Sequence, residues 1–539
     1  MKLLKNFKAT YLLIILILLV GLSLNLVNRY MIERLSVDGA NTLLFATGNW
    51  SSYYDMVNIK SPPLLTKAIT ADWKQYIMNN GPNSFGNIWK DSSVDVHPPL
   101  FYILLQSCFS IFGQSLIVAQ LTNVLIYILS AIIFFFLAQD LFERKHTFTA
   151  LLLYCVTPAS FAVTGEIRSY ALLGLFNITA LFAIIKIING YIGRKWWFVW
   201  IMSSIAALYT QYTYATIFIP TAAYVLFYCI KRENRFLLIR YVKIMILFTA
   251  LLIPLMVLFW QQKTVAHDIG WGGGWIENKN LSAAMIWVFF ETVTGSMRDI
   301  IFGLPVWINL IMGFIIYLVS FYSFTKLKNK KHSWLLSILL FATTIFHAVL
   351  YQFGVLPSHA IGAKYQVAAV PFILIAIICI IEGLKKRSWR ISFAVFIIFF
   401  MLLGSSYQIW KNYKSRDHRI SAYSMAKFVP KADLIILDST FSGLVGPVIF
   451  ALPEEQRILV GSQKDLLSKI DLKNVVIDEK FVVYISAVKY NEIELQEKII
   501  NRLLEAFGLH SSSSLEPITQ LSCSGGGRGY GIFYFKRDS

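Results

Sequence analysis

The most regular feature of this sequence is a series of long apolar runs separated by short polar segments. A helix needs about 20 residues to cross a hydrocarbon core of about 30 Å, and runs near that length recur from the N-terminus to residue 408. They occupy residues 10–28, 116–141, 147–164, 170–188, 196–210, 213–230, 241–260, 303–325, 334–353, 366–384 and 391–408. The pattern predicts a polytopic α-helical membrane protein with about 11 transmembrane helices.

Basic residues gather in alternate connections between these runs. The N-terminus and every second connection together hold 19 lysines and arginines, whereas the intervening connections of comparable length hold only two. Cytoplasmic loops carry an excess of such residues. We therefore expect a cytoplasmic N-terminus, an outer first loop at about 29–99, and an outer C-terminal region, because the number of helices is odd.

Composition agrees with a membrane location. The chain is 56% hydrophobic and only 15% charged, whereas a soluble domain is nearer one quarter charged. The net charge of +19 lies in clusters between apolar runs, so no nucleic-acid partner is expected. Five cysteines show neither a disulfide framework nor metal-ligand spacing, and we expect no metal or cofactor. The run Thr10–Val27 lacks a cleavage site, which favours a retained helix over a signal peptide.

Two further segments belong to the predicted outer side. Residues 99–113 are apolar but short, and spanning there would invert every later basic cluster. We therefore expect an interfacial or partly inserted helix that begins at the pair Pro98-Pro99. A second outer loop, 261–302, contains an amphipathic stretch at 283–294 that we expect to lie at the interface.

The composition changes after residue 409. Residues 410–539 are charged, with short apolar segments at 434–437, 457–460, 475–477, 482–485 and 530–535, and a helical pattern at 492–507. Short strands alternating with a helix predict a small extracytoplasmic α/β domain. The predicted domains are 1–409 and 410–539.

Ionisable side chains on the predicted outer side are few, and charge near a membrane is costly unless it has a role. They lie near helix ends: Asp38, Asp95, His97, Glu166, Arg168, His359 and Lys364, with Tyr365 beside them. An acid and several cations facing lipid predict a reaction at the phosphate head of a lipid-linked substrate.

Four motifs resemble those of the protein O-mannosyltransferase family (glycosyltransferase family 39) and its bacterial relatives. The segment Asp38-Gly39-Ala40 resembles the family's Asp-Glu-Ala, and His97 to Tyr102 resembles His-Pro-Pro-Leu-Tyr-Tyr. Glu166 to Leu172 resembles Glu-Ala-Arg-x-Tyr-Ala-Leu, and Lys364 to Pro371 is similar to a late segment that begins with Arg-Tyr. The motifs follow the family's order within a matching topology.

This resemblance implies a GT-C-fold glycosyltransferase that uses a polyprenyl-phosphate-linked sugar donor in a bacterial cell membrane. It implies Asp38 as the catalytic base, while Arg168 and Lys364 would bind the donor phosphate. Asp95, His97, Glu166, Tyr170 and Tyr365 would line the substrate pocket. The acceptor is a protein, a cell-wall polymer or a lipid. Gly39 stands where the family usually has Glu, so the accessory contact that this Glu side chain would make is in doubt.

The implied chemistry is consistent with these residue types. A carboxylate takes a proton from the acceptor hydroxyl as that oxygen attacks the anomeric carbon, opposite the leaving group, so the configuration inverts. The leaving group is a phosphate, which cations stabilise. No acid is needed to protonate it.

Each residue also has a structural interpretation. Asp38 suits the N-cap of a helix, and His97 with its prolines suits a helix start. Glu166 and Arg168 suit a mutual ion pair, and Lys364 suits an interfacial anchor. Asn49-Trp50-Ser51 is treated as a chance glycosylation pattern.

Two other functions fit parts of the pattern. A transporter or flippase for lipid-linked sugars would carry charges in mid-helix and show similar halves. An oligosaccharide transferase or glycan polymerase would share the architecture and move a larger unit.

Overall fold

The computed structural model describes most of the helical chain and parts of its loops. The described residues are 2–31, 35, 37–53, 68–78, 84–95, 97–191, 193–268, 292–293, 315, 317–327, 330–343, 367–418, 433–438, 442–461, 466, 481–488, 493–507 and 529–536.

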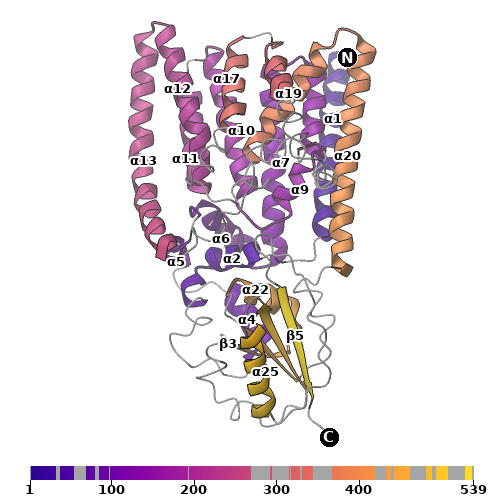
Figure 1. Ribbon diagram of the computed structural model, residues 1–539. Helices are drawn as coiled ribbons and strands as arrows, with labels where there is room; N and C mark the ends of the chain where they lie inside the picture. Colours follow the sequence, from indigo (N-terminus) through magenta and orange to yellow (C-terminus); the bar gives the residue numbers. More distant parts are fainter. Residues whose placement is uncertain are drawn as a thin grey trace. The chain divides into compact units, whose positions relative to one another are not determined.

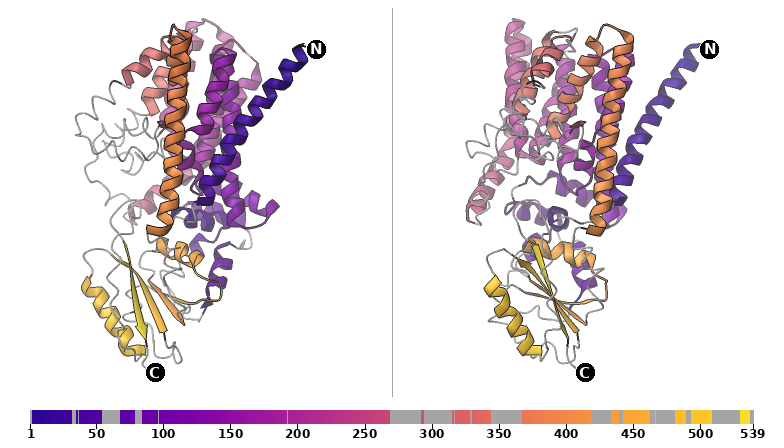
Figure 2. Two further views of the ribbon diagram at one scale, coloured as in Figure 1. Left: turned by 90° about the vertical axis from the view of Figure 1, so that its right-hand side faces the viewer. Right: turned by 45° about the vertical axis from the view of Figure 1, so that its right-hand side comes forward.

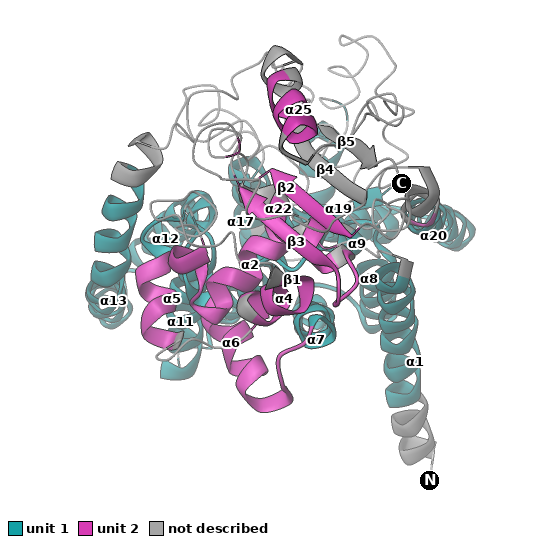
Figure 3. Ribbon diagram, turned by 90° about the horizontal axis from the view of Figure 1, so that it is seen from below, with its two compact units in different colours: residues 1–31, 92–101, 116–412 teal, residues 32–91, 102–115, 413–539 magenta. Residues whose placement is uncertain are grey.

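The chain divides into two compact units that alternate along the sequence (Figure 3). Unit 1 comprises residues 1–31, 92–101 and 116–412, and unit 2 comprises residues 32–91, 102–115 and 413–539. The first loop thus groups with the C-terminal residues, and no single cut in the sequence separates the units.

Unit 1 is a bundle of helices (Figure 1). Its described helices are α1 (Lys2–Met31), α7 (Leu116–Leu141), α8 (Arg144–Val156), α9 (Ala159–Thr164), α10 (Tyr170–Ile188), α11 (Arg194–Thr210), the 3-10 helix η1 (Tyr212–Tyr214), α12 (Ala215–Lys231), α13 (Arg235–Asp268), α17 (Lys330–Phe341), α19 (Val370–Gly383) and α20 (Arg387–His418). Helix α10 is central, because it packs against both α7 and α11.

Six helices within the described ranges are long and apolar enough to cross a membrane. They cover Thr10–Tyr30, Leu116–Leu141, Tyr170–Ile188, Tyr212–Lys231, Arg235–Lys263 and Arg387–Trp410. The inner span Tyr170–Ile188 is 72% buried, whereas the span in α13 is only 17% buried. Apolar side chains such as Ile246 and Phe399 are therefore exposed on outer helices, a surface that suits lipid and not water. The chain is a multi-pass membrane protein.

The predicted apolar runs match several helices closely. The segment 99–113 is helical, as expected, and forms α6 (Leu100–Phe112), while its place at the membrane interface stays a prediction. The runs 303–325 and 334–353 lie partly outside the described residues, so the total of about 11 transmembrane helices stays a prediction. Nearly all of the amphipathic stretch 283–294 also lies outside them.

Two predicted boundaries were wrong. The run 147–164 is not one helix, because α8 ends at Val156 and α9 begins at Ala159. Pro158 lies between them, and a proline removes a helical hydrogen bond. The helix predicted to end at residue 260 continues as α13 to Asp268. The polar residues after Trp260, which suggested a loop, include good helix formers such as glutamine and lysine.

Close packing between helices of unit 1 depends on small residues. A Cβ atom added to Gly21 of α1 would lie 2.9 Å from the Cβ of Cys155 in α8. The absence of a side chain at Gly21 thus lets the two helices approach, as small residues do in membrane bundles. Figure 2 shows α1 and α20 from two further sides.

Unit 2 combines short helices with a mixed sheet. Its described elements are α2 (Val37–Thr47), β1 (Ala68–Ile69), α4 (Thr70–Met78), α5 (Ser84–Ser92), most of α6, β2 (Leu434–Asp438), α22 (Ser442–Ala451), β3 (Arg457–Gly461), β4 (Phe481–Val488), α25 (Ile493–Phe507) and β5 (Gly529–Lys536). The predicted strands at 434–437, 457–460, 482–485 and 530–535 and the predicted helix at 492–507 correspond to these elements, while 475–477 lies outside the described residues.

The five strands have the order β1-β3-β2-β4-β5. Strand β2 is parallel to β3 and β4, whereas β1 and β5 pair antiparallel at the two edges. All five residues of β2 are buried, as expected of a central strand. Helix α25 runs along the sheet in Figure 2. Strand β1 comes from the first loop, so this loop completes the sheet.

Helix α2 ends in a turn that is fixed by hydrogen bonds. Gly48 has a φ of +69°, which favours glycine at a helix end. A short helical segment follows, where the buried Asp91 carboxylate accepts hydrogen bonds from the backbone N–H groups of Trp50 and Ser51 and from the Ser51 hydroxyl. Asn49 is only 8% exposed, which agrees with a chance glycosylation pattern.

Replacing Asp91 tests this arrangement. Asp91→Ala leaves the buried N–H of Trp50 and the partly buried N–H of Ser51 without their acceptor, and it should lower the free energy of unfolding of the unit by about 1–3 kcal/mol. Asp91→Asn keeps one acceptor oxygen and should lose less. The measurement is the midpoint of thermal unfolding in detergent. An unchanged midpoint for Asp91→Ala would contradict this role.

Candidate active site

The turn between α9 and α10 carries two of the predicted site residues, Glu166 and Arg168. The Arg168 N–H donates to the Glu166 carbonyl over 3.0 Å. The side-chain amide of Asn123, on α7, donates to the carbonyls of Glu166 (2.7 Å) and Arg168 (3.0 Å). A single buried amide from a neighbouring helix therefore holds both ends of the Glu166–Arg168 segment.

Arg29, in the last turn of α1, reaches the same turn. Its Nη1 donates to the Gly165 carbonyl over 2.6 Å, and Glu166 is close enough to interact with its charge. Arg29 and Arg168 are 8% and 7% exposed. The turn therefore gathers two buried guanidinium groups and one carboxylate.

Polar contacts between helices support this corner. The Thr164 hydroxyl of α9 donates to the Asn25 side chain of α1 over 2.6 Å, and the Asn25 amide donates to the Gly21 carbonyl. Tyr170, the first residue of α10, is fully buried two residues after Arg168. The structure thus brings the predicted residues Glu166, Arg168 and Tyr170 together.

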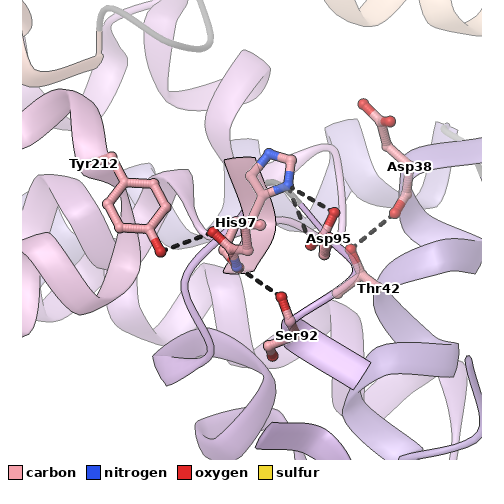
Figure 4. A network of polar contacts seen from close by, with 7 residues as sticks. Asp38, Thr42, Ser92, Asp95, His97 and Tyr212 are labelled. Atoms are coloured by element: carbon pink, nitrogen blue, oxygen red, sulfur yellow. Dashed lines mark hydrogen bonds and ion pairs between the residues drawn. The ribbon is translucent and has the colours of Figure 1, made fainter. Parts of the chain in front are cut away.

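A second group lies in the segment before α6, where Asp95 and His97 are neighbours. The Nδ1 atom of His97 is 3.3 Å from both carboxylate oxygens of Asp95 (Figure 4). Both side chains are buried, with 5% of Asp95 and 9% of His97 exposed. The carboxylate therefore lies where it can orient the imidazole ring.

Two residues that the sequence did not reveal hold this segment. Gln262 of α13 donates its amide to the carbonyls of Ser92 (2.6 Å) and His97 (3.2 Å). The Tyr212 hydroxyl donates to the Gln262 side-chain oxygen over 2.8 Å (Figure 4). Gln262 is 3% exposed, so this chain of contacts is shielded from solvent.

Asp38 belongs to unit 2 and lies in the first turn of α2. Its carbonyl accepts a hydrogen bond from the Thr42 hydroxyl over 2.8 Å, four residues along the helix (Figure 4). Asp38 is partly exposed, whereas Gly39 and Ala40 are buried. An anionic side chain in the first turn is favoured by the helix dipole. Lys364, Tyr365 and His359 lie outside the described residues.

Within the described ranges, one group of three side chains has the arrangement of a metal site. Ligand atoms of Glu143, His146 and Glu382 lie within 4.8 Å of one another. Lys145 forms an ion pair of 2.9 Å with Glu143, so an ammonium group already balances one of the two carboxylates. These residues belong to none of the four motifs.

Comparisons with known proteins support the resemblance. Residues 96–271 match the model of the dolichyl-phosphate-mannose-protein mannosyltransferase family. The matched segment contains the motifs at His97 and Glu166, but neither Asp38 nor the segment that begins at Lys364. No curated protein matches the chain.

Solved structures resemble the chain over nearly its whole length. ArnT from Cupriavidus metallidurans bound to undecaprenyl phosphate has a TM-score of 0.57 and 11% identity, over 96% of this chain and 97% of that one. The apo form has a TM-score of 0.55 and 10% identity, over 98% of both chains. The Archaeoglobus fulgidus oligosaccharyltransferase complex with Zn and sulfate has a TM-score of 0.46 and 13% identity, over 88% of this chain and 67% of that one.

These findings confirm the resemblance predicted from the motifs. The likeness to ArnT shows the fold of the chain. The family match covers the segment that contains His97, Glu166 and Arg168. The chain has the GT-C fold, and its segment 96–271 is similar to the dolichyl-phosphate-mannose-protein mannosyltransferase family.

Proposed function

We propose that this protein transfers a sugar from a polyprenyl-phosphate donor to an acceptor hydroxyl, with inversion at the anomeric carbon. The reaction takes place on the outer face of the cytoplasmic membrane, opposite the basic clusters. The family match and the GT-C fold support a lipid-phosphate donor. The acceptor is a protein, a cell-wall polymer or another lipid.

The observation that carries this proposal is the pair of buried guanidinium groups at the turn Gly165–Ser169. Arg29 lies close enough to Glu166 for their charges to interact, and the buried Arg168 follows Glu166 by two residues in the same turn. A sugar phosphodiester carries one negative charge, and the departing lipid phosphate gains a second as the bond to the sugar breaks. A fixed positive site therefore stabilises the transition state more than the bound donor, which is the requirement for catalysis.

Asp38 is the proposed base. A carboxylate in the first turn of a helix interacts favourably with the helix dipole, and a partly exposed one is accessible to a substrate. It accepts the proton of the acceptor hydroxyl as the new bond forms. The phosphate leaves as an anion, so a second carboxylate acting as an acid is not required.

The pair formed by Asp95 and His97 is proposed to line the acceptor pocket. Its geometry suits this role, because Asp95 fixes one ring nitrogen of His97 and Gln262 fixes the backbone. Lys364 and Tyr365 complete the proposed site as a second phosphate cation and a pocket residue. Glu166 and Tyr170 belong to the donor side.

The first experiment distinguishes this function from its alternatives. Purified protein in vesicles is given a radiolabelled polyprenyl-phosphate monosaccharide and cell-envelope material as the acceptor. Labelled product supports the proposal. Movement of the donor between leaflets without transfer would indicate a transporter, and transfer only from a lipid-linked oligosaccharide would indicate a transferase of larger units. Either result would overturn the proposal.

Asp38→Asn tests the base. The amide cannot accept the proton, and loss of a general base typically costs about 10²–10⁴ in rate. We expect this fall in turnover, while the thermal midpoint and the membrane yield stay near those of the parent protein. Asp72→Asn, another carboxylate in the first turn of a unit 2 helix, is the matched control. Full activity in Asp38→Asn would contradict the proposed role of Asp38 as the base.

Arg168→Ala tests the donor site. Loss of one preplaced cation should reduce turnover by about 10²-fold, and Arg168→Lys should recover only part of it because the planar fork of donors is lost. Binding of polyprenyl phosphate, followed as a thermal shift, should weaken in the same order. Arg235→Ala, at an exposed position, serves as the control. Equal lipid binding in Arg168→Ala and the parent would contradict this assignment.

A further inference from the structure

The helix that carries Asp38 is in close contact with a helix from the C-terminal part of the chain. Helices α2 and α22 pack against each other within unit 2. A Cβ atom added to Gly446 would lie 2.9 Å from the Cβ of Ala40. Ala40 is 1% exposed and Gly446 is buried. The two backbones thus approach as closely as a glycine permits.

Gly446 also contacts the segment that follows α2. The fully buried Tyr53 hydroxyl lies within hydrogen-bonding reach of the Gly446 backbone. Tyr53 belongs to the short helical segment whose start is held by Asp91. Gly446 therefore contacts the chain on both sides of the turn at Gly48.

Other contacts make α22 a fixed support. Two carbonyl groups in the segment after α22 accept hydrogen bonds from α4. The Leu452 carbonyl accepts one from Lys74 over 2.8 Å, and the Gln456 carbonyl accepts one from Thr70. Helix α4 in turn contacts α2, where the Thr47 hydroxyl donates to the Ile77 carbonyl. Helices α2, α4 and α22 thus form one packed group.

We infer that Gly446 is a positioning residue, which sets the place of Asp38 through its contact with Ala40. Asp38 lies two residues before Ala40 on the same short helix. A methyl group at residue 446 would force α2 and α22 apart, since ordinary contacts between such atoms begin near 3.4 Å. A misplacement of about 1 Å at a catalytic group can cost about 10²-fold in rate. This inference rests on the proposed role of Asp38.

The test uses full-length protein with three variants: Gly446→Ala, Ala40→Gly, and both together. Gly446→Ala should lower kcat by at least about tenfold, while KM for the polyprenyl-phosphate sugar stays within about twofold, because the proposed donor residues belong to unit 1. The double variant removes the Ala40 methyl group that clashes and should recover the kcat of Ala40→Gly alone. Gly193→Ala is the matched control, since an added Cβ there meets no atom within 4 Å.

Three results would overturn the inference. Gly446→Ala could keep the full kcat, or the double variant could be no more active than Gly446→Ala. A loss of activity that follows only the amount of folded protein would indicate a purely structural role. Asp38→Asn separates this inference from the function on which it rests. If Asp38→Asn is inactive and Gly446→Ala is fully active, only the positioning role fails. If Asp38→Asn is fully active, both fail.

Discussion

Burying a guanidinium group among apolar helices is the constraint on which the helical unit depends. Such a group is costly unless its N–H donors find acceptors, and near lipid those acceptors must come from the protein. The turn after α9 supplies the Gly165 carbonyl to Arg29, while Asn123 of α7 holds the carbonyls of Glu166 and Arg168. Three helices are thus connected by one short stretch of backbone.

This arrangement explains why the turn Gly165–Ser169 and the helix ends around it are polar in a chain that is otherwise apolar. Asn25 meets the same requirement. Its side-chain oxygen accepts a hydrogen bond from Thr164 of the neighbouring helix, and its amide donates to the Gly21 carbonyl of its own helix. Two arginines and one glutamate give this turn a formal charge of +1, which agrees with the proposed binding of an anionic donor there. A donor phosphate bound there, as proposed, would meet charges that are already in place, so little free energy would be spent on reorganising them during the reaction.

The sequence predicted the parts of the fold that depend on local periodicity. The runs 116–141 and 170–188 coincide with α7 and α10, and the pair Pro98-Pro99 directly precedes α6. It did not reveal Arg29, Tyr212 or Gln262 as site residues, since their contacts join residues distant in sequence. Arg29 in particular follows an apolar run, where arginine usually marks only the membrane boundary. The proposed roles of Lys364 and Tyr365 rest on the motifs alone, whereas that of Asp38 also draws on its place in the first turn of α2.

Strand β1 has a consequence for the synthesis of the protein. Its partner β3 is made only after all the described helices of unit 1, because Ala68 pairs with Ile458 and Ile69 with Arg457. The first loop is therefore synthesised long before its partner strand, and β1 stays unpaired while the later helices of the bundle are made. Contacts between such distant residues form slowly, and an unpaired strand invites wrong partners. The packing of α2 against α22 likewise depends on the C-terminal part of the chain, so unit 2 can be completed only after the helices of unit 1 have been synthesised.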